Sequence, residues 1–217
     1  MIGMGPSLRD QAHRLWMTVL TATPEAPPLA RFLADWPAFP LTLSQPGAPR
    51  PGSRDPPAQP LPVLRWLPRM AAATDCFGVD FVETLCRAAG SLDWRQTYSV
   101  AQVGEWFLQN YGWTELLSPG PATGVAQLSC GVLVLGPNTF YPAHRHEAEE
   151  LYLPLAGTAE WQQGDAAWRP RPPGTLIHHS SEEPHAMRTG EHPLLAMYLW
   201  RSIDLSQGAR LDRRSAG

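Results

Sequence analysis

The spacing of apolar residues differs between the two halves of this chain. In the first half, apolar residues recur every three or four positions, which predicts helices, whereas the second half contains short apolar or alternating runs typical of strands. The clearest helix covers residues 7–22, where Ser7 is a suitable N-cap and Asp10 occupies the capping-box position. A shorter helical pattern follows at residues 29–36. These two amphipathic segments need a surface to pack against.

Residues 40–62 interrupt the helical pattern. They are rich in Pro, Gly, Ser and Ala and offer little to bury, so we expect a loop or linker. Helical periodicity returns between residues 63 and 109, and the last helix of this part begins at about Ser99. We therefore assign residues 1–113 to an N-terminal helical region.

From Thr114 onward the chain reads as a series of short strands. Turn signals separate these strands at intervals of about eight to twelve residues, which favours a barrel or a sandwich. We expect a mainly β fold, with a β-barrel at residues 114–207, the N-terminal helical extension before it, and a frayed polar tail at residues 208–217. The whole chain is then α+β. The best-defined strands are predicted at residues 128–135, 158–162, 176–179 and 194–200.

Charge and composition exclude several classes of function. The 217 residues carry a formal net charge of -3, which gives no electrostatic attraction to nucleic acid or to anionic membranes. No apolar run approaches membrane-spanning length, and the three cysteines lack metal-type spacing, so we expect a cytoplasmic protein. The sequence leaves open whether the N-terminal helices cap the barrel, pack against a second subunit in a homodimer, or do both.

The densest cluster of polar side chains lies in the middle of the β region. His144, His146, Glu150 and Tyr152 all have even numbers, so on one strand their side chains would share a face and converge. Six of the seven histidines fall in the part assigned to the barrel. Imidazole and carboxylate groups arranged in this way are ligands for a divalent transition metal, and we assign the two histidines and the glutamate to that role.

The spacing of these residues resembles the first motif of the cupin superfamily. His144, His146 and Glu150 follow the pattern His-x-His-x3-Glu, and six residues separate the glutamate from Gly157, where a cupin strand turns. The resemblance implies a double-stranded β-helix barrel that holds one divalent metal. The ligand types suit Zn, Fe(II), Mn, Ni or Co, and they leave positions open for water or a substrate oxygen.

A fourth ligand has to come from later in the chain, where four histidines are candidates. His178 and His179 are adjacent, so at most one of them can face the interior of a barrel. His192 lies in a predicted turn, where a solvated role is expected. Cupins usually supply their last histidine from a Pro-His pair, and Pro184-His185 fits that pattern. The resemblance therefore implies His185.

The second half of the barrel narrows the resemblance to one family. Several segments resemble the cupin-type dimethylsulfoniopropionate lyases, over roughly residues 90–200. The resemblance implies a lyase that splits dimethylsulfoniopropionate into dimethyl sulfide and acrylate. One departure is the insertion of His192 between a glutamate and a proline that the family tends to have side by side. The segments are Trp94–Tyr98, Asn110–Trp113, Gly174–His179, Pro184–Thr189 and Pro193–Trp200.

The family resemblance also assigns roles to aromatic residues. Tyr152 matches the catalytic tyrosine of the family and is the expected base, with Tyr141 as the runner-up. A sulfonium group is best held over aromatic faces, so we expect Tyr98, Tyr141, Tyr198 and Trp200 to bind substrate. The metal ligands alone do not choose the chemistry. Two alternatives therefore remain: another metal-dependent cupin enzyme, an oxygenase or isomerase of a small carboxylate, and a cupin module that binds an osmolyte without turnover.

Overall fold

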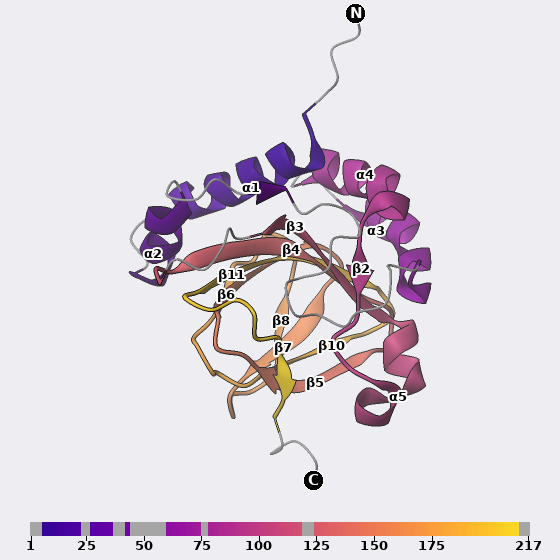
Figure 1. The fold of residues 1–217 in the computed structure, drawn as a ribbon. Coiled ribbons are helices and arrows are strands. Elements are labelled where there is room, and N and C mark those ends of the chain that lie inside the picture. Colours follow the sequence, from indigo (N-terminus) through magenta and orange to yellow (C-terminus); the bar gives the residue numbers. More distant parts are fainter. Residues whose placement is uncertain are drawn as a thin grey trace, which may run out of the picture.

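The computed structural model describes residues 6–22, 27–36, 42–43, 60–74, 78–118 and 124–212. Within these ranges the chain forms two antiparallel sheets, the larger lying above the smaller in Figure 1. The larger sheet has the order β1-β3-β4-β11-β6-β9, with β2 paired to β3, and the smaller has the order β12-β5-β10-β7-β8. The strands of the larger sheet are β1 (Thr42–Leu43), β2 (Trp94–Arg95), β3 (Tyr111–Ser118), β4 (Gln127–Leu135), β6 (Glu149–Ala156), β9 (Ile177–His179) and β11 (Leu194–Ser202). Those of the smaller are β5 (Phe140–Arg145), β7 (Ala159–Gln163), β8 (Arg169–Arg171), β10 (His185–Thr189) and β12 (Arg210–Leu211).

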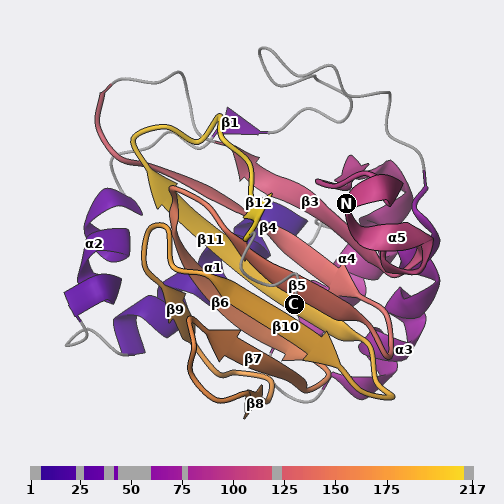
Figure 2. The same ribbon diagram turned by 90° about the horizontal axis from the view of Figure 1, so that it is seen from below.

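The connections between the sheets identify the barrel. Strands β4, β6, β9 and β11 belong to the larger sheet and β5, β7, β8 and β10 to the smaller, so the chain passes repeatedly from one sheet to the other. This order, β4-β11-β6-β9 facing β5-β10-β7-β8, is that of a jelly roll, the double-stranded β-helix. Figure 2 shows β5, β10 and β7 side by side, with α1 behind them. The predicted fold class, a cupin-type barrel with an N-terminal helical part, is confirmed.

Helices cover the outer face of the larger sheet, as Figure 1 shows for α1, α2, α3 and α4, while α5 lies beside the barrel. The first helix begins as predicted, because Asp10 accepts from the Ser7 backbone N–H at 3.1 Å and Ser7 Oγ accepts from the Asp10 N–H at 3.2 Å. The same reciprocal capping box, between Ser99 and Gln102, begins α5. The helices are α1 (Leu8–Ala22), α2 (Pro27–Asp35), α3 (Leu67–Ala73), α4 (Val79–Ala88) and α5 (Val100–Gln109), with 3-10 turns at Pro62–Trp66 and Ala89–Ser91.

Alternation along the strands of the larger sheet creates two cores. On β6, Leu151, Leu153 and Leu155 belong to the core beneath the helices, where each fully buried leucine contributes roughly 2 kcal/mol of transfer free energy. Tyr152, between them, belongs to the aromatic core inside the barrel. The helices are tied to this sheet, since the indole N–H of Trp16 in α1 donates to Cys130 Sγ in β4 at 3.2 Å. Both faces of the sheet are thus buried, one by helices and one by the second sheet.

The structure corrects three details of the predicted boundaries. The first long strand of the sheet begins at Tyr111, three residues before Thr114, because β3 pairs with β4 along its length. Most of the expected loop at residues 40–62 lies outside the described residues, but β1 within it pairs with β3. The expected frayed tail at residues 208–217 contains a strand, since β12 pairs with β5 and Asp212 forms an ion pair with Arg145 at 2.8 Å.

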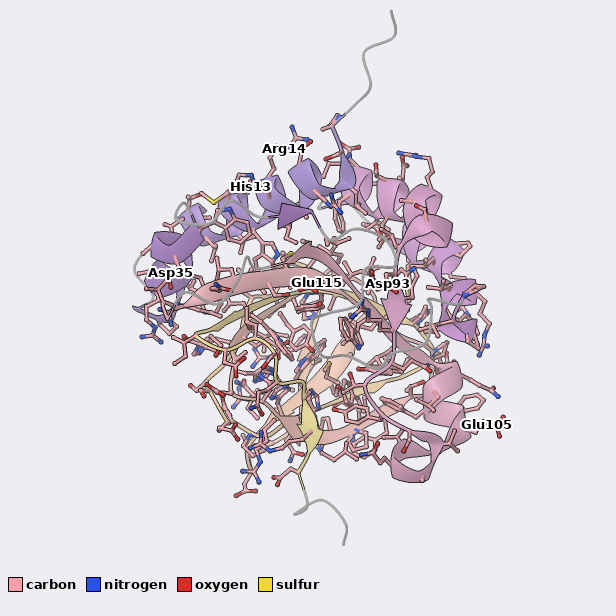
Figure 3. All side chains as sticks on the ribbon, viewed as in Figure 1. His13, Arg14, Asp35, Asp93, Glu105 and Glu115 are labelled. Carbon is pink, nitrogen blue, oxygen red and sulfur yellow. The ribbon has the colours of Figure 1, made fainter. Side chains whose placement is uncertain are left out.

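The outer side of the helices is polar. His13, the histidine outside the barrel, and its neighbour Arg14 project away from the sheet (Figure 3). Of the two cysteines that the structure describes, Cys130 is buried and Cys86 is half-buried, and both are free thiols. In the described part of the chain, no helix is both long and apolar enough to cross a membrane.

Candidate metal centre and active site

The histidine-rich stretch is not the single strand that its alternation predicted. Strand β5 ends at Arg145 and β6 begins at Glu149, so the chain crosses from the smaller sheet to the larger one between them. His144 therefore enters the barrel from one sheet, Glu150 enters from the other, and His146 lies in the crossover. The side chains still converge, because the inner faces of the two sheets face each other.

Strand pairing brings the later residues to the same place. His185 on β10 is the cross-strand partner of His144 on β5. Glu150 on β6 lies between His179 on β9 and Trp200 on β11, which are its partners on either side. Residues far apart in the chain thus meet at one position of the barrel interior.

Three of the four predicted ligands form a tight group. One ligand atom from each of His146, Glu150 and His185 lies within 4.8 Å of the other two, and all three residues are buried. His144 is also buried and lies beside this group, with its ring centroid 4.2 Å from that of His185. Its nitrogens do not belong to the group of three itself.

Backbone carbonyls fix the orientation of the three predicted histidine ligands. A carbonyl oxygen can only accept a hydrogen bond, so each Nδ1 that contacts one carries the proton. The lone pair of each imidazole is then on Nε2, which is the arrangement of a metal-binding histidine. The Nδ1 contacts are His144 with Pro142 O at 3.0 Å, His146 with Ala148 O at 2.7 Å, and His185 with Glu183 O at 2.9 Å.

The group fits a divalent cation. His146 Nε2 lies 3.0 Å and His185 Nε2 lies 3.2 Å from the same oxygen of Glu150, and the His185 nitrogen has no hydrogen bond among the described residues. Two nitrogen lone pairs directed at a carboxylate oxygen repel it unless a proton or a cation lies between them. Nitrogen and oxygen donors of this kind suit Zn, Fe, Mn, Ni or Co.

The electrostatics of the metal-free chain lead to the same conclusion. Burial by itself would raise the pKa of Glu150, but the neighbouring His146 and His185 side chains hold that pKa well below its usual range. Burial by itself lowers the pKa of His146, but the Glu150 carboxylate outweighs it and the pKa is raised. The carboxylate therefore stays ionised, and the site attracts positive charge.

Two of the predicted aromatic residues lie near the group formed by His146, Glu150 and His185. Trp200 donates its indole N–H to Glu150 Oε1 at 2.6 Å, and its ring lies 4.3 Å from that of His146. Tyr152 is buried, with its ring 6.4 Å from that of His185. Burial, and then the Glu150 carboxylate, raise the pKa of Tyr152 well above its usual value. These surroundings therefore favour the protonated phenol.

The other predicted aromatic residues form the wall of the interior. Tyr141 stacks on His144, with ring centroids 3.9 Å apart and planes 5° apart, and its hydroxyl lies 3.1 Å from that of Tyr98. Tyr198 extends across the neighbouring strand, since a Cβ at Gly131 would lie 2.4 Å from its hydroxyl oxygen. All five aromatic residues assigned from the sequence thus lie in the barrel, at different distances from the ligand group.

The sequence did not single out His179. This residue is fully buried, and its ring lies parallel to that of His185, with centroids 3.9 Å apart and planes 11° apart. Its neighbour His178 is directed the other way and contacts Glu149 at 2.8 Å. His178 and His179 thus point to opposite sides of β9, as alternation along a strand requires. Which of them faces Glu150 follows only from the pairing of β9 with β6.

The side chain of Glu149 lies on the outer side of β6. Its carboxylate contacts Arg31 of α2 at 2.5 Å and Arg201 of β11 at 3.6 Å, in addition to His178. Burial raises the pKa of Glu149, but the bonds with Arg31 and His178 outweigh it, and the pKa is lowered. Glu149 thus ties helix α2 to the sheet directly behind Glu150.

A double-stranded β-helix with buried histidines and a glutamate inside its barrel defines the class of the cupins. The family model for dimethylsulfoniopropionate lyase (DMSP lyase) matches residues 43–196, and the chain belongs to this family. The dimethylsulfoniopropionate lyase DddQ of Ruegeria pomeroyi is 36% identical over 115 residues, which cover 52% of this chain and 57% of that protein. The match thus spans little more than half the length of this relative.

Solved structures agree with the family assignment. A structure reported with the DMSP lyases RdDddP and RnDddQII superposes with a TM-score of 0.70 at 29% identity, covering 95% of this chain and 98% of the other. DddQ from Ruegeria pomeroyi DSS-3 superposes with a TM-score of 0.65 at 23% identity, with the same coverage, and shows the same fold.

Proposed function

We propose that this protein is a metal-dependent lyase that cleaves dimethylsulfoniopropionate into dimethyl sulfide and acrylate. The observation that carries the proposal is the orientation of His144, His146 and His185, whose Nδ1 atoms contact backbone carbonyls. Their Nε2 atoms are free to bind a cation inside a barrel with an aromatic wall. Membership of the DMSP lyase family, over residues 43–196, supports the substrate.

The proposed metal ligands are His146, Glu150 and His185, with His144 as a fourth. The first three already lie within 4.8 Å of one another, and His144 adjoins them with its Nδ1 held by Pro142 O. A divalent transition ion held there would withdraw charge from a bound carboxylate and so acidify the neighbouring Cα proton.

The aromatic wall suits the other end of the substrate. A sulfonium carries positive charge and cannot donate a hydrogen bond, so it is held by the electron-rich faces of aromatic rings. Tyr98, Tyr141, Tyr198 and Trp200 all line or adjoin the interior, and we assign the sulfonium to these faces. The same wall excludes water, which strengthens every electrostatic interaction inside.

Tyr152 is the proposed base. It takes the Cα proton, the electrons of that C–H bond form the new double bond, and the Cβ–S bond breaks as dimethyl sulfide leaves with its electron pair. Burial, and then the negative charge of Glu150, oppose ionisation of the phenol, so a cation that compensates this charge would favour the phenolate that acts as base. Tyr141 is the alternative base, and its phenol is fully buried and stacked on His144.

The test is the release of dimethyl sulfide into the headspace, measured after loading the protein with Zn, Fe(II), Mn, Ni or Co in turn. Tyr152→Phe should lower kcat by at least about 100-fold, the usual effect of removing a general base, with its metal content unchanged. Tyr141→Phe should retain most of the turnover. Full turnover in Tyr152→Phe with loss in Tyr141→Phe would exchange the two roles, and no dimethyl sulfide with any of the five metals would disprove the lyase.

A further inference from the structure

His179 faces the metal centre, although no metal-binding or catalytic role has been assigned to it. The pairing of β9 with β6 sets it directly opposite Glu150, and its side chain is fully buried. Its ring lies parallel to that of His185 at 3.9 Å between centroids and 6.0 Å from that of Tyr152. A fourth imidazole of the barrel interior is thus in contact with a ligand and near the proposed base.

The hydrogen bonds of Gln163 determine which nitrogen of His179 carries the proton. The Gln163 amide is fixed at both ends, because its Oε1 accepts from Arg171 at 3.4 Å and its Nε2 donates to the His178 carbonyl at 2.7 Å. The same Nε2 lies 3.4 Å from His179 Nδ1. Since the amide nitrogen can only donate, His179 Nδ1 is the acceptor and the proton is on Nε2.

This arrangement is the reverse of that found at the three proposed histidine ligands. In those, a carbonyl holds the proton on Nδ1 and leaves the Nε2 lone pair free. His179 instead directs an N–H into the site, and a protonated nitrogen cannot bind a metal. Its Nε2 is buried and has no hydrogen-bond partner among the described residues. Buried donors are almost always paired in native proteins, so an unpaired one beside a ligand group indicates a missing acceptor.

We propose that His179 is a substrate-binding residue whose Nε2–H donates to a carboxylate oxygen of the bound substrate. The inference rests on the proposed function, which supplies a substrate with one carboxylate and one sulfonium. Of these two ends only the carboxylate can accept a hydrogen bond, and the N–H dipole repels the sulfonium. The carboxylate end is therefore fixed on the β9 side of the metal centre, and Gln163 acts as the positioning residue that sets the His179 tautomer.

The test measures binding of acrylate, a small carboxylate, to the metal-loaded protein by calorimetric titration, together with metal content by elemental analysis. His179→Leu should weaken acrylate binding about tenfold or more, the usual effect of losing a hydrogen bond to a charged group, with one metal per chain retained. His179→Gln, which returns an N–H to nearly the same place, should recover most of this affinity. His178→Leu is the matched control and should bind acrylate like the wild type.

Two results would overturn the inference: unchanged acrylate affinity in His179→Leu, or loss of metal from that variant, which would make His179 a ligand. Failure of the wild type to bind acrylate would overturn it as well. If His179→Leu does not fold, Gln163→Leu keeps the ring but frees its tautomer and should still weaken binding at least about threefold. Acrylate binding needs no turnover. A wild type that releases no dimethyl sulfide but binds acrylate more tightly than His179→Leu does would therefore disprove the lyase while supporting the role of His179.

Discussion

Trp200 and Glu150 are held together by the pairing of β11 with β6, and the Trp200 indole N–H donates to Glu150 Oε1 at 2.6 Å. The other oxygen of this carboxylate lies 3.0 Å from His146 Nε2 and 3.2 Å from His185 Nε2. The indole therefore occupies one oxygen and leaves the second available to bind a cation. A hydrogen bond of this kind orients a metal-binding side chain and increases the affinity of a site for its metal.

Replacing this tryptophan tests the arrangement. Trp200→Phe keeps an aromatic ring beside His146 but removes the donor, and we expect metal affinity to fall by about 10- to 100-fold. Competition with a chelating dye gives the affinity. Trp106→Phe, at an exposed tryptophan of α5, should have no effect. Equal metal affinity in the two variants would show that the indole does not support Glu150.

His185 on β10 faces the interior of the barrel, whereas His178 on β9 faces outward. We therefore expect opposite effects on metal binding when each is replaced. His185→Ala removes a proposed ligand and should abolish metal binding. His178→Ala should retain full metal content, because His178 contacts Glu149 on the outer side of the sheet. It should lower the free energy of unfolding by about 1 kcal/mol, the usual cost of a partly buried hydrogen bond. Elemental analysis and urea unfolding distinguish the two, and metal loss in His178→Ala alone would reverse the ligand assignment.

The surroundings of Gly157 leave no room for a side chain. Its φ is +77°, and a Cβ there would lie 2.0 Å from the Pro193 carbonyl oxygen, a backbone atom that cannot move aside easily. We expect Gly157→Ala to lower the free energy of unfolding by about 3 kcal/mol, from the left-handed backbone and the clash together. Gly190→Ala has no neighbour within 4 Å and should change it by less than about 0.5 kcal/mol. Similar urea midpoints for both variants would contradict this.

Stability should fall at alkaline pH. Burial raises the pKa of Cys130 to about 12 and that of Tyr111 to about 12, so both stay protonated in the folded chain while the unfolded chain releases their protons from about pH 9 and 10 upward. The unfolded state then binds fewer protons, and each group costs up to about 1.4 kcal/mol of stability per pH unit until pH 12. Thermal unfolding between pH 8 and 11.5 should show the decline. The decline in stability with pH should be shallower in Tyr111→Phe than in the wild type. An identical slope in the two proteins would show that Tyr111 does not contribute to it.

Much of the fold, and the choice of most candidate site residues, follow from local sequence patterns and from the family resemblance. The capping box at Ser7, the change of hydrophobic period and the turn at Gly157 are all local signals, and each has its predicted structure. The three residues that lie within 4.8 Å of one another, His146, Glu150 and His185, were chosen as candidate ligands from spacing and resemblance. Short-range rules were sufficient for the capping box and the turn. The choice of His185 rested on the family resemblance, because this residue meets Glu150 only through the packing of the two sheets.

What the sequence could not supply depends on sheet pairing. Alternation suggested one strand through His146, yet the chain changes sheet there, and nothing local distinguishes a crossover from a continuous strand. The choice of His179 over His178 for the interior, and the bond from Trp200 to Glu150, both require the register of β6 with its two neighbours. Register between strands far apart in the chain cannot be read from a single sequence.

The proposed lyase depends on one divalent ion held inside the barrel by His146, Glu150 and His185, with His144 as a fourth ligand. The most direct measurement is a metal titration of chelator-treated protein, with dimethyl sulfide release followed at each addition. Release should be absent at the start, rise in proportion to bound metal, and level off at one ion per chain. Full release from the metal-free protein, or none after one ion is bound, would contradict the claim.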